Sequence, residues 1–221
     1  MMSLLIANEE WSIAAAAAVC RWYVSEHPAT LAYYDFGGTN ADPHPHDDVG
    51  LSDAGRLVVI NARPTADDVP RMIEAAQSAP WDAVRHEEDI TVAPDVTDLL
   101  DRAELLYRHF RDAGLGPTRT HKLLHLKRPT VFPVVDSVVR RTYAGAARNA
   151  GRDRRSTQSY FWPVLVEEMR ANTGAYRELI VQLGDHPACR LTIPRLADIL
   201  VWSLHGQQRS DARAAAAPAS R

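Results

Sequence analysis

The sequence has little cysteine and no long apolar run. Cys20 and Cys189 are its only cysteines, too few for a disulfide framework and without the clustered spacing of zinc or iron–sulfur ligands. The apolar run Ile13–Cys20 has eight residues before Arg21 closes it, whereas a membrane-spanning helix needs about 20. We therefore expect no membrane segment, and a reducing cytoplasm is the simplest location.

The N-terminus also lacks the charge pattern of a secretory signal. The first ten residues contain no Lys or Arg, and Glu9 and Glu10 precede the apolar run. The chain has 221 residues, of which 46% are hydrophobic and 24% charged, close to the average for folded soluble proteins. This composition predicts one folded domain.

The apolar spacing favours helices along most of the chain. Between Asp95 and Gly114, apolar residues recur every three or four positions, which predicts one amphipathic helix that ends at Gly114. The same reasoning predicts the further helices 9–27, 69–76, 117–126, 136–147, 160–172, 174–183 and 192–205. The short run Leu57–Ile60 is ambiguous between strand and helix, and we favour helix. The fold class is therefore all-α, a compact multi-helix domain over residues 1–206, with a disordered tail at 207–221.

Charge is distributed unevenly along the chain. Residues 1–117 hold 8 arginines and 20 acids, a net charge of −12. Residues 118–155 hold 10 basic residues and 2 acids, a net charge of +8, and the remainder has a net charge of +1. Such a basic block suits a polyanion partner. The alternative is that these charges pair with the acidic first half of the chain.

A glycine-containing turn precedes the basic block. Gly114-Leu115-Gly116 separates two expected helices, so that backbone N–H groups at the start of the second helix can face outward and hold a phosphate. An extended link containing Pro133 follows the second helix, and Asp136 then opens the next one. On backbone grounds alone, an Asp at this place is a helix N-cap.

This stretch resembles the helix-hairpin-helix superfamily of DNA glycosylases. In that superfamily a Gly-apolar-Gly hairpin is followed about twenty residues later by a Val-Asp-Thr-His-apolar-x-Arg segment whose aspartate is catalytic; here Gly116 precedes Asp136 by 20 positions. Val135, Asp136, Ser137, Val139 and Arg141 match the segment in kind. The resemblance covers about 30 residues. It implies a glycosylase-like fold and a catalytic role for Asp136.

The departures from the superfamily concern its chemistry. Val138 replaces the histidine, and Thr118 stands where the bifunctional members carry a Schiff-base lysine. The cluster-binding cysteines are absent too, so no cofactor is expected. The resemblance therefore implies a monofunctional enzyme, if the protein is an enzyme at all.

A second resemblance covers more of the chain. The strings Thr120–Pro129, Phe132–Ser137 and Arg195–Trp202 look like an uncharacterised bacterial family, a domain of unknown function. This resemblance implies no activity.

Together these patterns lead to the hypothesis of a DNA-interacting protein, with a function in DNA repair by base excision. Asp136 is the expected catalytic residue, and double-stranded DNA the expected partner. The expected nucleic-acid contacts are Gly114, Gly116, Thr118, Lys122, Lys127, Arg128, Arg140 and Arg141. The rival hypothesis is a non-catalytic module that binds nucleic acid or another protein. We expect no metal site, and the sequence predicts no particular oligomeric state.

Overall fold

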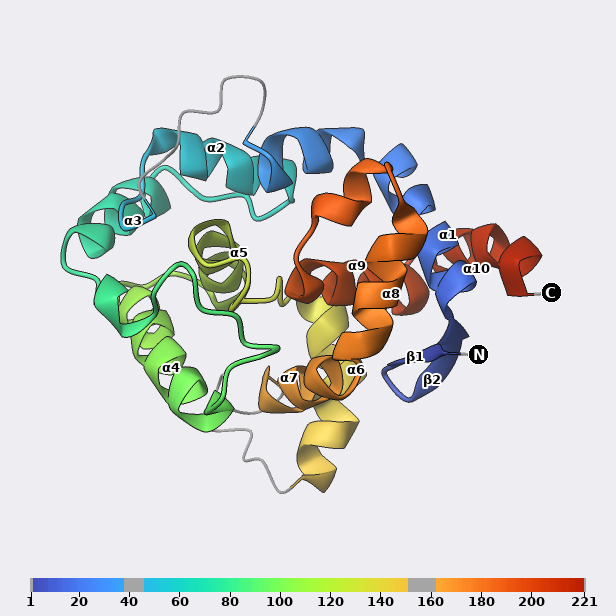
Figure 1. Ribbon diagram of the computed structural model, residues 1–221. Helices are drawn as coiled ribbons and strands as arrows, with labels where there is room; N and C mark the ends of the chain where they lie inside the picture. Colours follow the sequence, from blue (N-terminus) through green and yellow to red (C-terminus); the bar gives the residue numbers. More distant parts are fainter. Residues whose placement is uncertain (1, 38–45, 151–161, 221) are drawn as a thin grey trace. The chain divides into compact units, whose positions relative to one another are not determined.

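The structure, a computed structural model, describes residues 2–37, 46–150 and 162–220 (Figure 1). Most of these residues are helical. In chain order the elements are β1 (Ser3–Ile6), β2 (Glu9–Ser12), α1 (Ile13–Glu26), the π-helical η1 (Thr30–Asp35), α2 (Leu51–Val59), α3 (Asp68–Gln77), the 3-10 turn η2 (Trp81–Ala83), α4 (Val96–Asp112), α5 (Pro117–Lys127), α6 (Ser137–Asn149), α7 (Trp162–Ala171), α8 (Thr173–Leu183), the 3-10 turn η3 (Pro187–Arg190), α9 (Ile193–His205), α10 (Arg209–Ala216) and the 3-10 turn η4 (Ala217–Ser220). The expected helical fold class is thus confirmed for the described part of the chain.

The contacts within the chain form two compact units. Residues 28–134 make the central unit, and residues 1–27 together with 135–221 make the terminal unit. The sequence predicts one domain over residues 1–206, and the boundaries between the two units fall inside that range. Among the described residues, no helix has both the length and the apolar character needed to cross a membrane.

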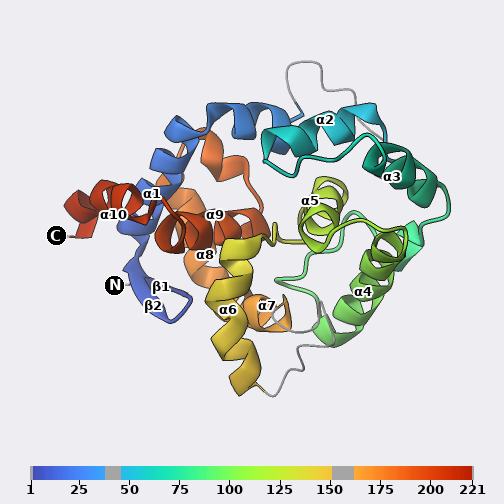
Figure 2. The same ribbon diagram turned by 180° about the vertical axis from the view of Figure 1, so that it is seen from behind.

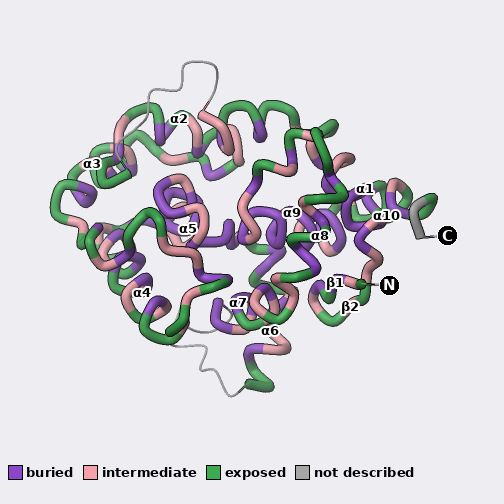
Figure 3. The backbone as a smooth tube through the Cα atoms, in the orientation of Figure 1, coloured by how far each residue is buried: buried purple, intermediate pink, exposed green. Residues whose placement is uncertain are grey.

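In the terminal unit, α1 packs against α8, α9 and α10, and α9 also packs against α6 (Figure 2). Alanines make this close packing possible, since Ala15, Ala16 and Ala17 of α1 are at most 1% exposed. Almost every residue of α9 is buried as well (Figure 3). The predicted helix that starts at Thr192 is confirmed, with the Thr192 side chain accepting from the Arg195 N–H.

The N-terminal strands correct one prediction. The first helix is predicted from Glu9 onward, but Glu9–Ser12 is a strand that pairs antiparallel with β1. Ala7 and Asn8 form the two-residue turn with φ of 50° and 68°, the backbone of a tight hairpin. Leu4 and Ile6 of β1 are fully buried. Their burial in the core outweighs the weak helical preference of so short a segment.

The C-terminal tail is a second correction. The sequence predicts disorder from residue 207, but Arg209–Ala216 is helix α10, which packs against α1 and α9. Ala212 and Ala216 are 0% and 1% exposed. Composition suggested a solvated tail, yet two small residues one helical turn apart let the α10 backbone approach α1.

In the central unit, α4 and α5 form a helical hairpin. α4 buries Leu99, Ala103, Leu106, Tyr107 and Phe110, the apolar stripe that the sequence predicts. α5 is buried along most of its length (Figure 3). The ambiguous run Leu57–Ile60 begins inside α2, so the preference for helix there is confirmed through Val59.

Candidate nucleic-acid interface

The turn between α4 and α5 is the centre of the candidate site. Gly114 has φ of +88°, a left-handed conformation that favours glycine and ends α4 as predicted. Leu115 is fully buried and anchors the turn, and its N–H donates to the Phe110 carbonyl. Gly116 is the N-cap of α5, with Pro117 at the first helical position.

The start of α5 presents backbone donors without acceptors. In the described part of the chain, the N–H groups of Gly116, Thr118 and Arg119 make no hydrogen bond, and Pro117 has no N–H. Gly116 has no side chain to cap the helix, and a Cβ added there would meet open space. Unsatisfied N–H groups at a helix N-terminus carry partial positive charge and suit an anion.

Arginines surround this turn. The Nη1 atom of Arg71, from α3, lies 3.4 Å from the place where a Cβ on Gly114 would stand. Arg111 of α4 donates to the Leu115 carbonyl. Arg119 of α5 forms an ion pair with Asp68 at 2.7 Å and donates to the Ala62 carbonyl at 3.1 Å. Arg71 is exposed and, among the described residues, makes no hydrogen bond or ion pair, although its positive charge helps to lower the pKa of Asp68.

An open groove of about 450 Å³ lies beside the turn, between α3 and α4. The Nε2 atom of His109 lies 2.8 Å from the Ala75 carbonyl oxygen and joins the two helices. The groove is lined by Arg71, Glu74, Ala75, Ser78, His109, Asp112 and Ala113. Arg71 therefore borders both the groove and the turn.

The predicted lysine contacts lie inside the central unit. Lys122 Nζ donates to the Ile60 carbonyl at 2.6 Å, and the side chain is 6% exposed. Lys127 Nζ forms an ion pair with Asp53 at 2.7 Å, with the two residues 2% and 0% exposed. Burial lowers the pKa of Lys127 from its usual value, and Asp53 opposes that shift. Both ammonium groups thus donate to acceptors within the central unit.

Arg128 is buried in the same way. It is 2% exposed and donates to the Val84 carbonyl at 2.5 Å, the His46 carbonyl at 2.7 Å and Asp47 Oδ1 at 2.5 Å. The ion-pair partners of Lys127, Arg128 and Arg119 are Asp53, Asp47 and Asp68, which belong to the acidic first half of the chain, as in the alternative raised by the sequence. Burial argues against phosphate contacts by Lys122, Lys127 and Arg128.

Asp136 is the N-cap of α6, as the backbone reasoning predicts. Its Oδ1 accepts from the N–H groups of Val138 and Val139 at 2.8 and 3.0 Å. Its Oδ2 makes no hydrogen bond within the described residues. One carboxylate oxygen therefore holds the helix, and the other remains available for binding or chemistry.

The structure places the predicted site residues in two groups. Gly114, Gly116 and half-exposed Thr118 belong to the turn in the central unit, while Asp136, Arg140 and Arg141 belong to α6 in the terminal unit. Arg140 and Arg141 are both exposed. The sequence alone does not point to Arg71, whose place beside Gly114 depends on the packing of α3 against α4. Arg119 could have been found, since it lies three residues after Gly116.

Histidine is a common metal ligand, so the histidines of α5 are a further candidate. His121 and His125 of α5, four residues apart, are both buried, and His125 Nδ1 lies 2.6 Å from the Phe132 carbonyl oxygen. His44 lies outside the described residues. Within the described ranges, no cluster of three or more His, Cys, Asp or Glu side chains could hold a metal ion.

These features define a mostly helical protein with a helical hairpin whose turn is open to an anion. The profile of the family of unknown function DUF6308 matches residues 16–205, so the chain belongs to that family. The second resemblance, to an uncharacterised family, is thereby confirmed. No curated protein and no solved structure matched the chain. Nothing in these comparisons supports the relationship to helix-hairpin-helix glycosylases.

Proposed function

We propose that the protein binds double-stranded DNA and that the α4–α5 turn contacts a backbone phosphate. The observation that carries the proposal is the set of three backbone N–H groups, at Gly116, Thr118 and Arg119, that have no acceptor among the described residues. A helix N-terminus of this kind binds the phosphate of a nucleic acid through hydrogen bonds and the helix dipole. Arg71, whose guanidinium lies beside Gly114, adds the positive charge that holds a polyanion.

The proposed contacts are fewer than the sequence predicts. The turn supplies Gly114, Gly116 and Thr118 together with Arg71, and α6 supplies the exposed Arg140 and Arg141. The buried Lys122, Lys127 and Arg128 stabilise the central unit and take no part in binding. The protein therefore contacts DNA through few charges, and binding is correspondingly sensitive to the loss of any one of them.

Gly116→Asp tests this proposal. An aspartate N-cap satisfies the free N–H groups of α5 and keeps or slightly raises stability. Its negative charge occupies the proposed phosphate site, so affinity for a short labelled duplex at low salt falls about fivefold or more, since a helix end holds an anion with roughly 1 kcal/mol. Fluorescence anisotropy measures the affinity, and thermal melts confirm folding.

Two variants serve as controls. Gly116→Asn caps the same helix without the charge and should weaken binding less than Gly116→Asp. Arg177→Ala removes an exposed arginine on α8, in the terminal unit, and should leave affinity within about twofold. Wild-type protein that binds no duplex at low salt, or Gly116→Asp that binds like the wild type, contradicts the proposal.

A second candidate function is monofunctional base excision on a glycosylase-like scaffold. The free Oδ2 of Asp136 favours it, because a carboxylate can stabilise the positive charge that develops on the sugar as a base leaves. Thr118 stands in place of a lysine and cannot form a Schiff base. Base excision at this site would therefore leave the DNA strand uncleaved.

Asp136→Asn separates this activity from DNA binding. The amide oxygen can still cap α6, so the fold and the affinity for DNA should persist while base release from damaged or mismatched duplexes disappears. Base release that survives in Asp136→Asn removes Asp136 as the catalyst. A wild type that binds DNA but releases no base from any lesion leaves the non-catalytic binding module as the function.

A further inference from the structure

The two outer edges of the N-terminal β-hairpin differ in their hydrogen bonding. On β1, the Leu5 N–H points away from β2 and donates to Asn172 Oδ1 at 3.0 Å. At the turn, the Ala7 N–H donates to Glu168 Oε2 at 3.0 Å. The outer edge of β1 is therefore capped by side chains that come from α7 and from the residue after it.

The outer edge of β2 has no such cap. Ile6 and Glu9 flank the two-residue turn and form a hydrogen-bonded pair, so the next pair, Leu5 and Glu10, directs its backbone groups outward. The outward Leu5 N–H on β1 agrees with this register. Within the described residues, the N–H and C=O of Glu10 make no hydrogen bond. An unpaired strand edge of this kind can accept a further strand.

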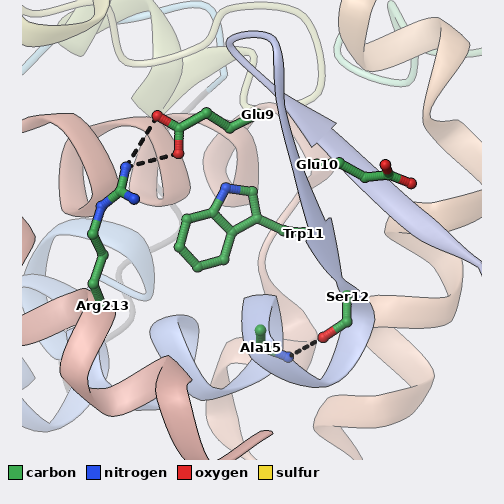
Figure 4. A pocket seen from close by; sticks show the side chains of 6 residues that line it. All are labelled: Glu9, Glu10, Trp11, Ser12, Ala15 and Arg213. Atoms are coloured by element: carbon green, nitrogen blue, oxygen red, sulfur yellow. Dashed lines mark hydrogen bonds and ion pairs between the residues drawn. The ribbon is translucent and has the colours of Figure 1, made fainter. Parts of the chain in front are cut away.

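An open groove of about 360 Å³ runs along β2 (Figure 4). Arg213 of α10 is one of the residues that line it, and its Nη2 atom lies 3.0 and 2.7 Å from the two carboxylate oxygens of Glu9. The guanidinium also lies 5.4 Å from the centre of the Trp11 ring. Glu9 is thus neutralised, whereas Glu10 points away from this ion pair, as Figure 4 shows, and keeps its charge exposed. Ser3 Oγ donates to Glu10 but adds no positive charge.

We propose that an extended segment of another protein adds to the free edge of β2, with a basic side chain opposite Glu10. The backbone N–H and C=O of Glu10 pair with the incoming strand, as in β-strand addition. The charge on Glu10 selects the partner, because an opposite charge directly across the strands stabilises the pair. This site lies in the terminal unit and does not depend on the proposed DNA binding.

The negative charge of Glu10 disfavours two other occupants of this strand edge, a second copy of the chain and a nucleic acid. A second copy of this chain, paired antiparallel about Glu10, would place two glutamates directly opposite each other, which destabilises the pairing. A nucleic acid would meet the same negative charge. A basic extended peptide meets neither obstacle.

The test uses two five-residue peptides, acetyl-Thr-Val-Lys-Val-Thr-amide and the same peptide with Glu at its centre. Titration into isotope-labelled protein should shift the backbone amide of Glu10 and the Trp11 indole N–H and slow hydrogen exchange at Glu10. The lysine peptide should bind about two- to fivefold more tightly than the glutamate peptide, the ratio that one cross-strand charge pair supplies. Glu10→Lys, at an exposed position that the fold does not need, should reverse this preference.

Two controls test the strand pairing itself. A lysine peptide that is N-methylated at its central residue lacks the donor for the Glu10 carbonyl and should not bind, whereas side-chain attraction alone would leave its binding intact. Sedimentation measures self-association, and a dimer that Glu10→Lys alters would identify a second copy as the occupant and overturn the proposal. Absence of any shift at Glu10 with both peptides would overturn it as well.

Discussion

Lys127 and Asp53 form an ion pair that is buried on both sides. The two residues are 2% and 0% exposed, and Asp53 Oδ2 also accepts the Gly50 N–H at 2.9 Å. Asp53 Oδ1 has no hydrogen-bond partner in the part of the chain that the structure describes. Removal of the ammonium would leave a carboxylate in the interior without a countercharge, which costs far more than loss of an exposed pair.

We therefore expect Lys127→Met to lower the free energy of unfolding by about 3–5 kcal/mol. The double variant Lys127→Met with Asp53→Asn removes both charges but keeps an acceptor for Gly50, and should recover more than half of that loss. Urea denaturation of the wild type, the single and the double variant measures both effects. A loss below about 1 kcal/mol in the single variant would show that the pair is not desolvated.

His205, at the end of α9, gives the terminal unit a sensitivity to acid. Burial lowers the pKa of His205, Glu9 raises it, and Arg213 and Arg209 lower it further. The unfolded chain binds the proton first, so stability falls as pH drops below the ordinary histidine value of about 6.5 towards the folded-state pKa.

His205→Gln should reduce this loss of stability on acidification, because a neutral side chain cannot take up the proton. Thermal melts of the wild type and the variant between neutral and mildly acidic pH measure the difference. Identical pH dependence in the two proteins would show that other groups, such as His186 with its own lowered pKa, account for the effect.

Helix α10 packs against α1 through buried alanines. Ala212 is 0% exposed, while Ala214 on the same helix is exposed. Ala212→Leu should lower the free energy of unfolding by about 1–3 kcal/mol, because extra methylene groups overpack a filled interface.

Ala214→Leu is the matched control, with the same change in helix propensity and volume, and should alter stability by less than about 0.5 kcal/mol. Chemical denaturation compares the two variants. Equal stability of both variants would mean that α10 does not pack in solution, as expected for the disordered tail that composition suggests.

The helices could be predicted from the sequence because their apolar stripes are local patterns. The Ala7–Asn8 hairpin could not, since its strands have four residues each and its anchor Asn172 lies 167 positions from Leu5. The candidate turn could be predicted from Gly114 and Gly116. The burial of Lys127 in an ion pair could not be predicted, because its partner Asp53 lies 74 positions away and no periodic pattern links the two residues.

The two units differ in net charge. Residues 28–134 carry 11 basic and 17 acidic residues, a net charge of −6, and the rest carries 14 basic and 11 acidic residues, a net charge of +3. The basic block of the sequence is therefore divided between the two units. Its members in the central unit are offset by acids of that unit, and the positive charge that remains belongs to the terminal unit.

The salt dependence of DNA binding should reflect this division. Replacement of Arg140 and Arg141 by Ala should lower the slope of log affinity against log salt by up to about two, near one unit per phosphate contact. Arg71→Ala should lower it by about one. Slopes that remain unchanged in both variants would mean that these arginines do not contact phosphate.

The terminal unit is built from two pieces of chain, one that ends at His27 and one that begins at Val135. On the ribosome, α1 therefore emerges long before the helices α8, α9 and α10 that cover it. Synthesis of residues 28–134 takes roughly 5–20 s at typical rates, and the central unit is complete in that interval. During this interval the apolar face of α1 lacks the helices that cover it in the folded protein. This face includes the buried alanines, Val19 and Cys20. This early segment is where a chaperone would bind the nascent chain.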